Sequence, residues 1–134
     1  MAERRPAPVV VTMEEKSTMA LEAPHIRQLA AELAAPLPRG RELAAENAAA
    51  WASETMPPGL AAALSRLLEV ALVLEDDETA MEAELNALSE MSGYGLVPRD
   101  VIERVLASRE WAFPWATDLV EGLREDLPVA REQA

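Results

Sequence analysis

Apolar residues recur at alternating steps of four and three from residue 60 to residue 88, and this spacing constrains the fold more than any other feature of the chain. The residues at these positions are Leu60, Leu64, Leu67, Ala71, Leu74, Glu78, Met81, Leu85 and Leu88. Only Glu78 interrupts the apolar series. A strand would instead alternate every second residue, so the spacing predicts α-helix over about residues 60–92.

Two descriptions of residues 60–92 stay open. The apolar series continues on both sides of Glu78, which favours one long helix with a charged defect. Thr79 followed by Glu82 is instead a capping-box pair, which favours a second helix that starts at residue 80. We expect one long central helix, kinked near Glu78.

Prolines, glycines and capping pairs mark the other helices. Helical spacing is found in "MEEKSTMAL" (13–21), from Pro24 to the "PLPRG" stop, in "RELAAENAAAWASETM" (41–56), from Asp100 (buried stripe Val101, Ile102, Val105 and Leu106) and from Pro114 (Trp115, Leu119, Leu123 and Leu127). In the third of these, Leu43, Asn47 and Trp51 share one side. We therefore expect an all-α fold: a single-domain helical bundle of five or six helices with a long central helix.

The ends of the chain are expected to lie outside this bundle. Residues 1–12 are interrupted by proline and predict an extended or flexible N-terminal arm. Residues 13–127 form the predicted helical domain, and the polar residues 128–134 predict a frayed tail.

The charge of the chain is negative and unevenly distributed. The net charge is −12, and no basic residue stands between Arg66 and Arg99. That interval holds Glu69, Glu75, Asp76, Asp77, Glu78, Glu82, Glu84 and Glu90. Such a field repels nucleic-acid phosphates and anionic membrane surfaces and attracts a basic partner. We therefore expect neither nucleic acid nor membrane among the partners of this protein.

Several catalytic chemistries lack their residue types. The chain has no Cys, one His (His25) and one Lys (Lys16), which excludes thiolate nucleophiles and metal centres built on paired imidazoles. The composition favours a non-enzymatic protein with no catalytic residue and no cofactor. The absence of Cys fits a cytoplasmic setting, and eleven Arg against one Lys are typical of a GC-rich bacterial genome.

The main hypothesis is a small acidic protein that serves as a protein–protein interaction module of the immunity, antitoxin, chaperone or adaptor type. Its partner is expected to be a basic protein, and the apolar series leaves a homodimer open. The expected acidic face comprises Glu75, Asp76, Asp77, Glu78, Glu82 and Glu84. A structural subunit of a larger assembly is a second reading.

An enzymatic alternative rests on three carboxylates. If the central helix is continuous, Glu75, Glu78 and Glu82 point the same way and could share a Mg²⁺ ion. This arrangement resembles one half of the acidic motif of the all-α nucleoside triphosphate pyrophosphatases, which implies a Mg²⁺-dependent nucleotide pyrophosphohydrolase. That family pairs an E-x-x-E helix with an E-x-x-D helix, and the region of Asp118 and Glu121 does not reproduce the second half.

Three aromatic residues cluster in "REWAFPWATDL". Helical spacing places Phe113 and Trp115 on buried stripes, whereas Trp111 falls off the apolar face. Trp111 is expected either to fold back over the Pro114 junction as a clasp or to stay exposed as a partner-binding anchor.

Overall fold

The computed structural model describes residues 23–130, so the predicted N-terminal arm, the predicted helix at 13–21 and the last four residues of the tail lie outside the described residues. Within this range the helices are α2 (Ala23–Leu33), α3 (Pro38–Trp51), α4 (Pro58–Leu74), α5 (Glu78–Gly93), α6 (Arg99–Ala107) and α7 (Thr117–Asp126). Two short 3₁₀ helices, η1 (Pro114–Ala116) and η2 (Leu127–Val129), flank α7. The prediction of an all-α bundle of five or six helices is confirmed.

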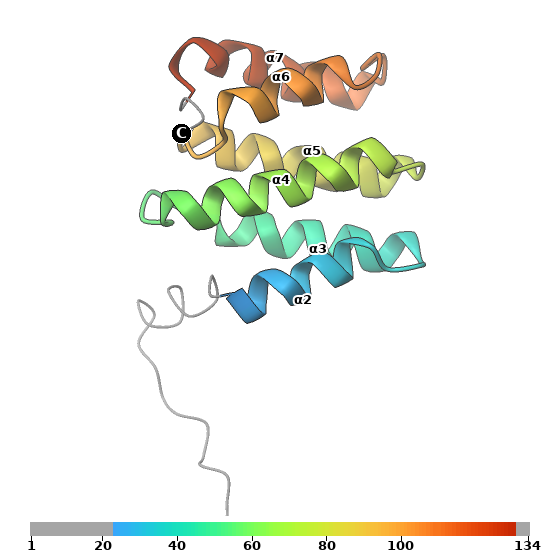
Figure 1. Ribbon diagram of the computed structural model, residues 1–134. Helices are drawn as coiled ribbons and strands as arrows, with labels where there is room; N and C mark the ends of the chain where they lie inside the picture. The colour runs from blue at the N-terminus through green and yellow to red at the C-terminus, as the bar shows by residue number, and fades with distance from the viewer. Residues whose placement is uncertain (1–22, 131–134) are drawn as a thin grey trace, which may run out of the picture.

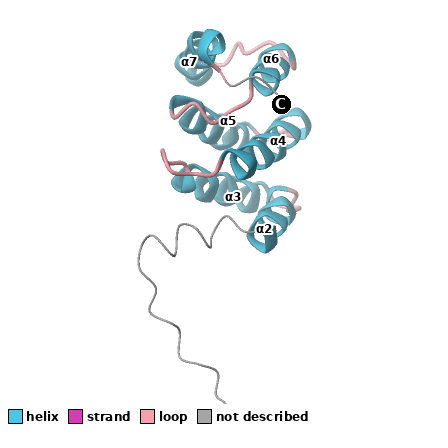
Figure 2. Ribbon diagram, turned by 60° about the vertical axis from the view of Figure 1, so that its left-hand side comes forward, coloured by secondary structure: helices cyan, strands magenta, loops and turns pink. Residues whose placement is uncertain are grey.

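The six helices form three antiparallel pairs stacked side by side (Figures 1 and 2). Helices α2, α4 and α6 make one layer, and α3, α5 and α7 make the other. Each pair packs mainly on the next pair, an arrangement typical of short helical solenoids. The turns within the three pairs lie along one side of the stack, at the right in Figure 1.

The predicted single helix over residues 60–92 is wrong, because α4 ends at Leu74 and α5 begins at Glu78. Glu75 and Asp77 both have extended backbones, with φ/ψ of −75°/132° and −99°/124°. The Asp77 carboxylate accepts a hydrogen bond from the Ala80 amide at 2.9 Å and so caps the N-terminus of α5. On α5 the apolar series is buried at Met81, Leu85 and Leu88, but on α4 only Leu64 of the series is fully buried and Leu74 is 76% exposed.

The core is formed by leucines from α2, α4 and α5 and by alanines from α3. Its largest fully buried side chains include Leu29, Leu64, Leu68, Leu72, Leu85 and Leu88. Helix α3 buries Ala44, Ala45 and Ala48, whereas Leu43 and Asn47 are exposed. Small side chains let α3 lie close to α5, so the buried side of α3 is the alanine side and not the one that carries Leu43.

The C-terminal helices follow their predicted stripes. Val101, Ile102 and Val105 of α6 are fully buried, and Leu123 of α7 is fully buried as well. Beyond α7 the chain forms η2, and Ala130 packs into the core cluster.

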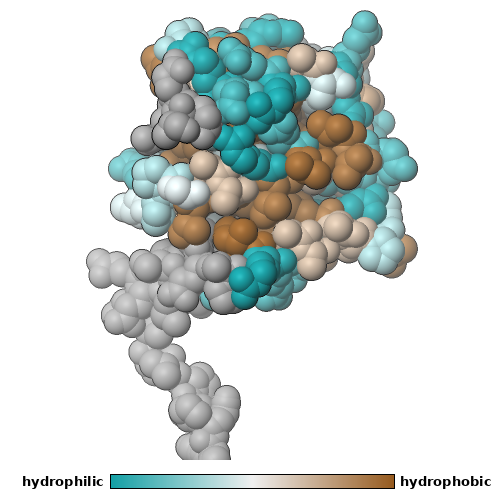
Figure 3. Space-filling view, in the orientation of Figure 1, coloured by the Kyte–Doolittle hydropathy of each residue, from teal (hydrophilic) through white to brown (hydrophobic). Residues whose placement is uncertain are grey.

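The layer of α2, α4 and α6 presents apolar side chains to solvent, and Figure 3 shows them gathered over α4. Val70, Val73 and Leu74 of α4 are 56%, 51% and 76% exposed. Helix α4 is therefore apolar on its outer side as well as on its buried side. Within residues 23–130, no helix has both the length and the apolar character needed to cross a membrane.

Candidate functional site

The six acids expected on one face do not share an exposed surface. Glu84 is fully buried and Glu75 is 5% exposed, whereas Asp76, Glu78 and Glu82 are exposed and Asp77 is half-buried as a helix cap. Because the chain breaks between α4 and α5, the Glu75 side chain points toward Arg41 and the Glu78 side chain points toward Trp115. The acidic interval therefore divides into a buried junction and an exposed remainder.

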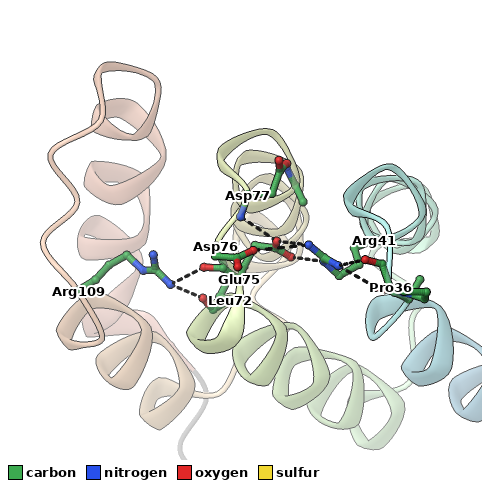
Figure 4. Close-up of polar contacts among 9 residues, drawn as sticks. Pro36, Arg41, Leu72, Glu75, Asp76, Asp77 and Arg109 are labelled. Atoms are coloured by element: carbon green, nitrogen blue, oxygen red, sulfur yellow. Dashed lines mark hydrogen bonds and ion pairs between the residues drawn. The ribbon is translucent and has the colours of Figure 1, made fainter.

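Glu75 is held at this junction by Arg41 of α3 (Figure 4). Arg41 Nε and Nη2 each donate to one carboxylate oxygen of Glu75 at 2.8 Å, and the Asp77 amide donates to Glu75 Oε2 at 3.0 Å. Burial alone would raise the pKa of Glu75, but the hydrogen bonds from Arg41 and the other donors outweigh it and lower the pKa to about 2. Glu75 is therefore a buried, ionised carboxylate with its partner in place.

Arginines tie the junction to the neighbouring pairs. Arg41 also donates to the backbone oxygens of Ala35 at 2.8 Å and of Pro36 at 3.3 Å, in the turn between α2 and α3. Arg109, from the segment after α6, donates to the backbone oxygen of Leu72 at 2.6 Å near the end of α4 (Figure 4). Arg41 donates to carbonyl groups of the turn between α2 and α3, and Arg109 donates to the Leu72 carbonyl, which also accepts from the Glu75 amide at 3.3 Å. The acidic interval has no basic residue of its own, so the first and third helix pairs supply the arginines, Arg41 and Arg109, that bind at this junction.

Glu84 lies behind this junction on α5, with no part of its side chain reaching solvent. Burial, and next the neighbouring Glu75 carboxylate, raise the pKa of Glu84 to about 9. The protonated Glu84 carboxyl donates a side-chain hydrogen bond to the Glu75 carboxylate. Glu84 is therefore neutral at pH 7 and belongs to the interior of the protein.

The exposed acid Glu82 belongs to a different feature, a cleft of about 440 Å³ between α3, α5 and the start of α7. Its charged lining residues are Glu42, Glu46, Glu82 and Asp118, and its aromatic wall is Trp115. Among the described residues that line this cleft there is no basic side chain. We call these five residues and the space between them the acidic cleft.

Trp115 is fixed in this wall by two contacts. Its Nε1 donates to Glu78 Oε2 at 2.6 Å, and its ring stacks on Phe113 with the centroids 5.0 Å apart. Both rings are partly buried and pack against the core, as their predicted stripes require. The indole of Trp115 therefore reaches from the core to the acidic cleft.

Trp111 takes the position of a clasp. It is half-buried and packs against the core, and its Nε1 donates to the Val105 backbone oxygen of α6 at 3.0 Å. The guanidinium of Arg109 lies 5.4 Å from the centre of its ring, within the range of a cation–π contact. These contacts fold the segment after α6 back onto the helix.

The three carboxylates of the magnesium alternative do not converge. Glu75 turns inward to Arg41, Glu78 accepts from Trp115, and Glu82 lines the acidic cleft. Nowhere in residues 23–130 do three or more His, Cys, Asp or Glu side chains form a group able to hold a metal ion. The continuous helix on which the shared Mg²⁺ site depended is absent.

Glu42 and Glu46 were not singled out from the sequence, and Asp118 was considered only for the second half of the pyrophosphatase motif. Glu42 and Glu46 stand at i and i+4 on α3, as Glu78 and Glu82 do on α5, and this common spacing was the available signal. Nothing local indicated that the two helix faces would meet Trp115 and Asp118 across one cleft. Comparisons with protein-family models, curated protein sequences and solved structures find no match to this chain.

Proposed function

We propose that this protein is a non-enzymatic interaction module whose acidic cleft binds a basic segment of a partner protein. The observation that carries the proposal is the acidic cleft itself, where four carboxylates surround one indole and no basic side chain among the described residues lines the space. The net charge of −12 adds a long-range field of the same sign.

The chemistry of the acidic cleft suits arginine and lysine side chains. Carboxylates from three helices can accept hydrogen bonds from a guanidinium, which carries five donors in a planar fork. A cation that lies over the face of Trp115 gains a further cation–π contribution of about 0.5–1 kcal/mol at an exposed site. Glu42 already pairs with Arg39 at 3.0 Å across one turn of α3, so Glu46, Glu82 and Asp118 are the acids left for a partner.

The association of such a partner is expected to depend on salt. Electrostatic attraction between exposed charges is screened over about 10 Å at 0.1 M ionic strength. A tagged full-length protein should therefore capture a basic protein from a lysate of its native host at low salt and release it at high salt. Recovery of no basic partner, or of one whose binding ignores salt, would contradict the proposal.

Charge-reversal variants distinguish the contribution of the acidic cleft to partner binding from the contribution of the net charge. Glu46→Lys and Glu82→Lys change the net charge by the same amount as Glu103→Lys, which lies on exposed α6 in the opposite layer. We expect the two cleft variants to lose capture of the partner and Glu103→Lys to retain most of it. Equal losses in all three variants would show that only the net charge matters.

A further inference from the structure

A second surface, on the layer opposite the acidic cleft, carries an inference that does not rest on the proposed function. A groove of about 410 Å³ runs between α2 and α4. Ala30, Leu33 and Ala34 line its α2 side, and Leu67, Val70 and Leu74 line its α4 side. Figure 3 shows this apolar region facing solvent over α4.

The charges at the groove decide what it can accept. Its lining includes Arg41, Glu75 and Asp76 at the end where α4 stops. Arg41 is neutralised by its two hydrogen bonds to Glu75, so the lining has a net charge of −1 from Asp76. The Asp76 side chain is 94% exposed, and its Oδ1 lies 3.8 Å from Arg41 Nη2. An apolar ligand with a carboxylate, such as a fatty acid, would meet like charge there.

The shape of the lining indicates a helical ligand. Alanines on α2 leave space, and Val70 and Leu74 stand one turn apart on α4 with more than half of each side chain exposed. Large apolar side chains at i, i+3, i+4 and i+7 of an incoming helix would fill such a groove and remove these side chains from water. A basic residue at its end would reach Asp76.

We propose that the α2–α4 groove binds an amphipathic helix of a partner protein, with its apolar side on Val70 and Leu74 and a lysine or arginine beside Asp76. The occupant is thus apolar and cationic, in keeping with the charge of the groove and of the whole chain.

The test uses the full chain and a synthetic peptide of about 16 residues, with leucines at i, i+3, i+4 and i+7, lysines at both ends and alanine and glutamine elsewhere. Fluorescence anisotropy of the labelled peptide should show saturable binding. Val70→Asp and Leu74→Asp place a charge in the apolar contact and should weaken binding by at least about tenfold. Val129→Asp is the matched control, because Val129 is 80% exposed on η2 away from the groove, and it should bind as the native chain does.

Two further variants fix the location and the charge preference. Asp76→Lys should reverse the preference, so that a peptide with terminal glutamates binds better than the peptide with terminal lysines. Glu103→Lys, on an exposed position of α6 outside both the groove and the acidic cleft, should leave peptide binding unchanged. Circular dichroism melts establish whether each variant is folded. If Leu74→Asp does not fold, Val70→Asp still tests the apolar contact in the groove.

Several results would overturn the proposal. One is that the native chain does not bind the lysine peptide, or binds the glutamate peptide equally well. Another is that Val129→Asp or Glu103→Lys loses as much affinity as Leu74→Asp. A dimer in sedimentation that Leu74→Asp dissociates would assign the groove to a second copy. Methyl contacts in NMR between Val70 and residues 1–22 without peptide would assign it to the chain's own N-terminal segment.

Discussion

Arg41 and Glu75 are 34 positions apart in the chain and form a two-bond ion pair at the turn between α4 and α5. Their side chains are 16% and 1% exposed, so the charges are largely withdrawn from water. Removal of one partner leaves the other charge buried without compensation. This pair therefore adds a buried polar link between the first and second helix pairs to the packing of α3 on α5.

Arg41→Ala is expected to lower the free energy of unfolding by about 3–5 kcal/mol, because Glu75 would stay buried without a cation. Urea denaturation at pH 7 measures this change. Arg39→Ala is the matched control, since Arg39 is 66% exposed and its pair with Glu42 is worth at most about 1 kcal/mol. A loss as small as that of the control would show that the buried pair does not couple the helices.

Glu84 should make the stability of the protein fall as pH rises. Its pKa is about 9 in the folded protein and 4.5 ordinarily, so the folded chain holds an extra proton between these values. The stabilisation that comes from this retained proton is fully present below pH 4.5, the pKa of Glu84 in the unfolded chain. Above that pH the free energy of unfolding falls by about 1.4 kcal/mol per pH unit, until the folded pKa is reached. The charges that act on it are the carboxylate of Glu75 and the guanidinium groups of Arg41 and Arg109.

The measurement compares the native chain with Glu84→Gln, which cannot ionise, from about pH 5 to about pH 8. The stability of the native chain relative to Glu84→Gln should fall steadily over this range. Glu90→Gln, on the exposed side of α5, should follow the native chain at every pH. A constant difference between the native chain and Glu84→Gln would mean that Glu84 titrates normally.

Asp77→Ala should cost about 1 kcal/mol, because the N-terminus of α5 would lose its capping hydrogen bond to the Ala80 amide. Asp76→Ala removes the same charge from the neighbouring residue, whose side chain is 94% exposed. This variant should change the free energy of unfolding by less than about 0.5 kcal/mol. Thermal unfolding of the two variants side by side tests the difference. Equal effects would argue that charge, and not the cap, sets the break between α4 and α5.

Trp111→Ala should destabilise the protein by about 2 kcal/mol, less than the 3–5 kcal/mol typical of a fully buried aromatic residue. The loss combines the half-buried ring with the hydrogen bond to the Val105 oxygen. Trp111→Phe keeps most of the ring and should lose only about 1 kcal/mol. Unchanged stability of Trp111→Ala together with lost partner capture would instead support the anchor role.

Local sequence patterns predicted which segments are helical better than they predicted where each helix begins and ends. The helical stripes on α6 and α7 were confirmed because their buried residues recur within one or two turns. The junction at residues 75–77 was missed because the apolar spacing survives a reversal of the chain, and Asp77 caps α5 two residues before the predicted capping pair. On α3 the sequence analysis placed Leu43, Asn47 and Trp51 on one side but did not identify the alanine side, which packs closely on α5 because its side chains are small.

The sequence by itself determined the helical class of the protein, most of its buried stripes and its strongly acidic character, because helix periodicity and net charge depend on near neighbours and on composition. Only the tertiary structure decided which acids are buried, which line the acidic cleft and where the α2–α4 groove opens. Those outcomes depend on contacts between residues about one helix pair apart, such as Arg41 with Glu75 and Trp115 with Glu78. The direction in which α5 returns from α4 sets these contacts, and the extended backbone of Glu75 and Asp77 together with the Asp77 cap controls that direction.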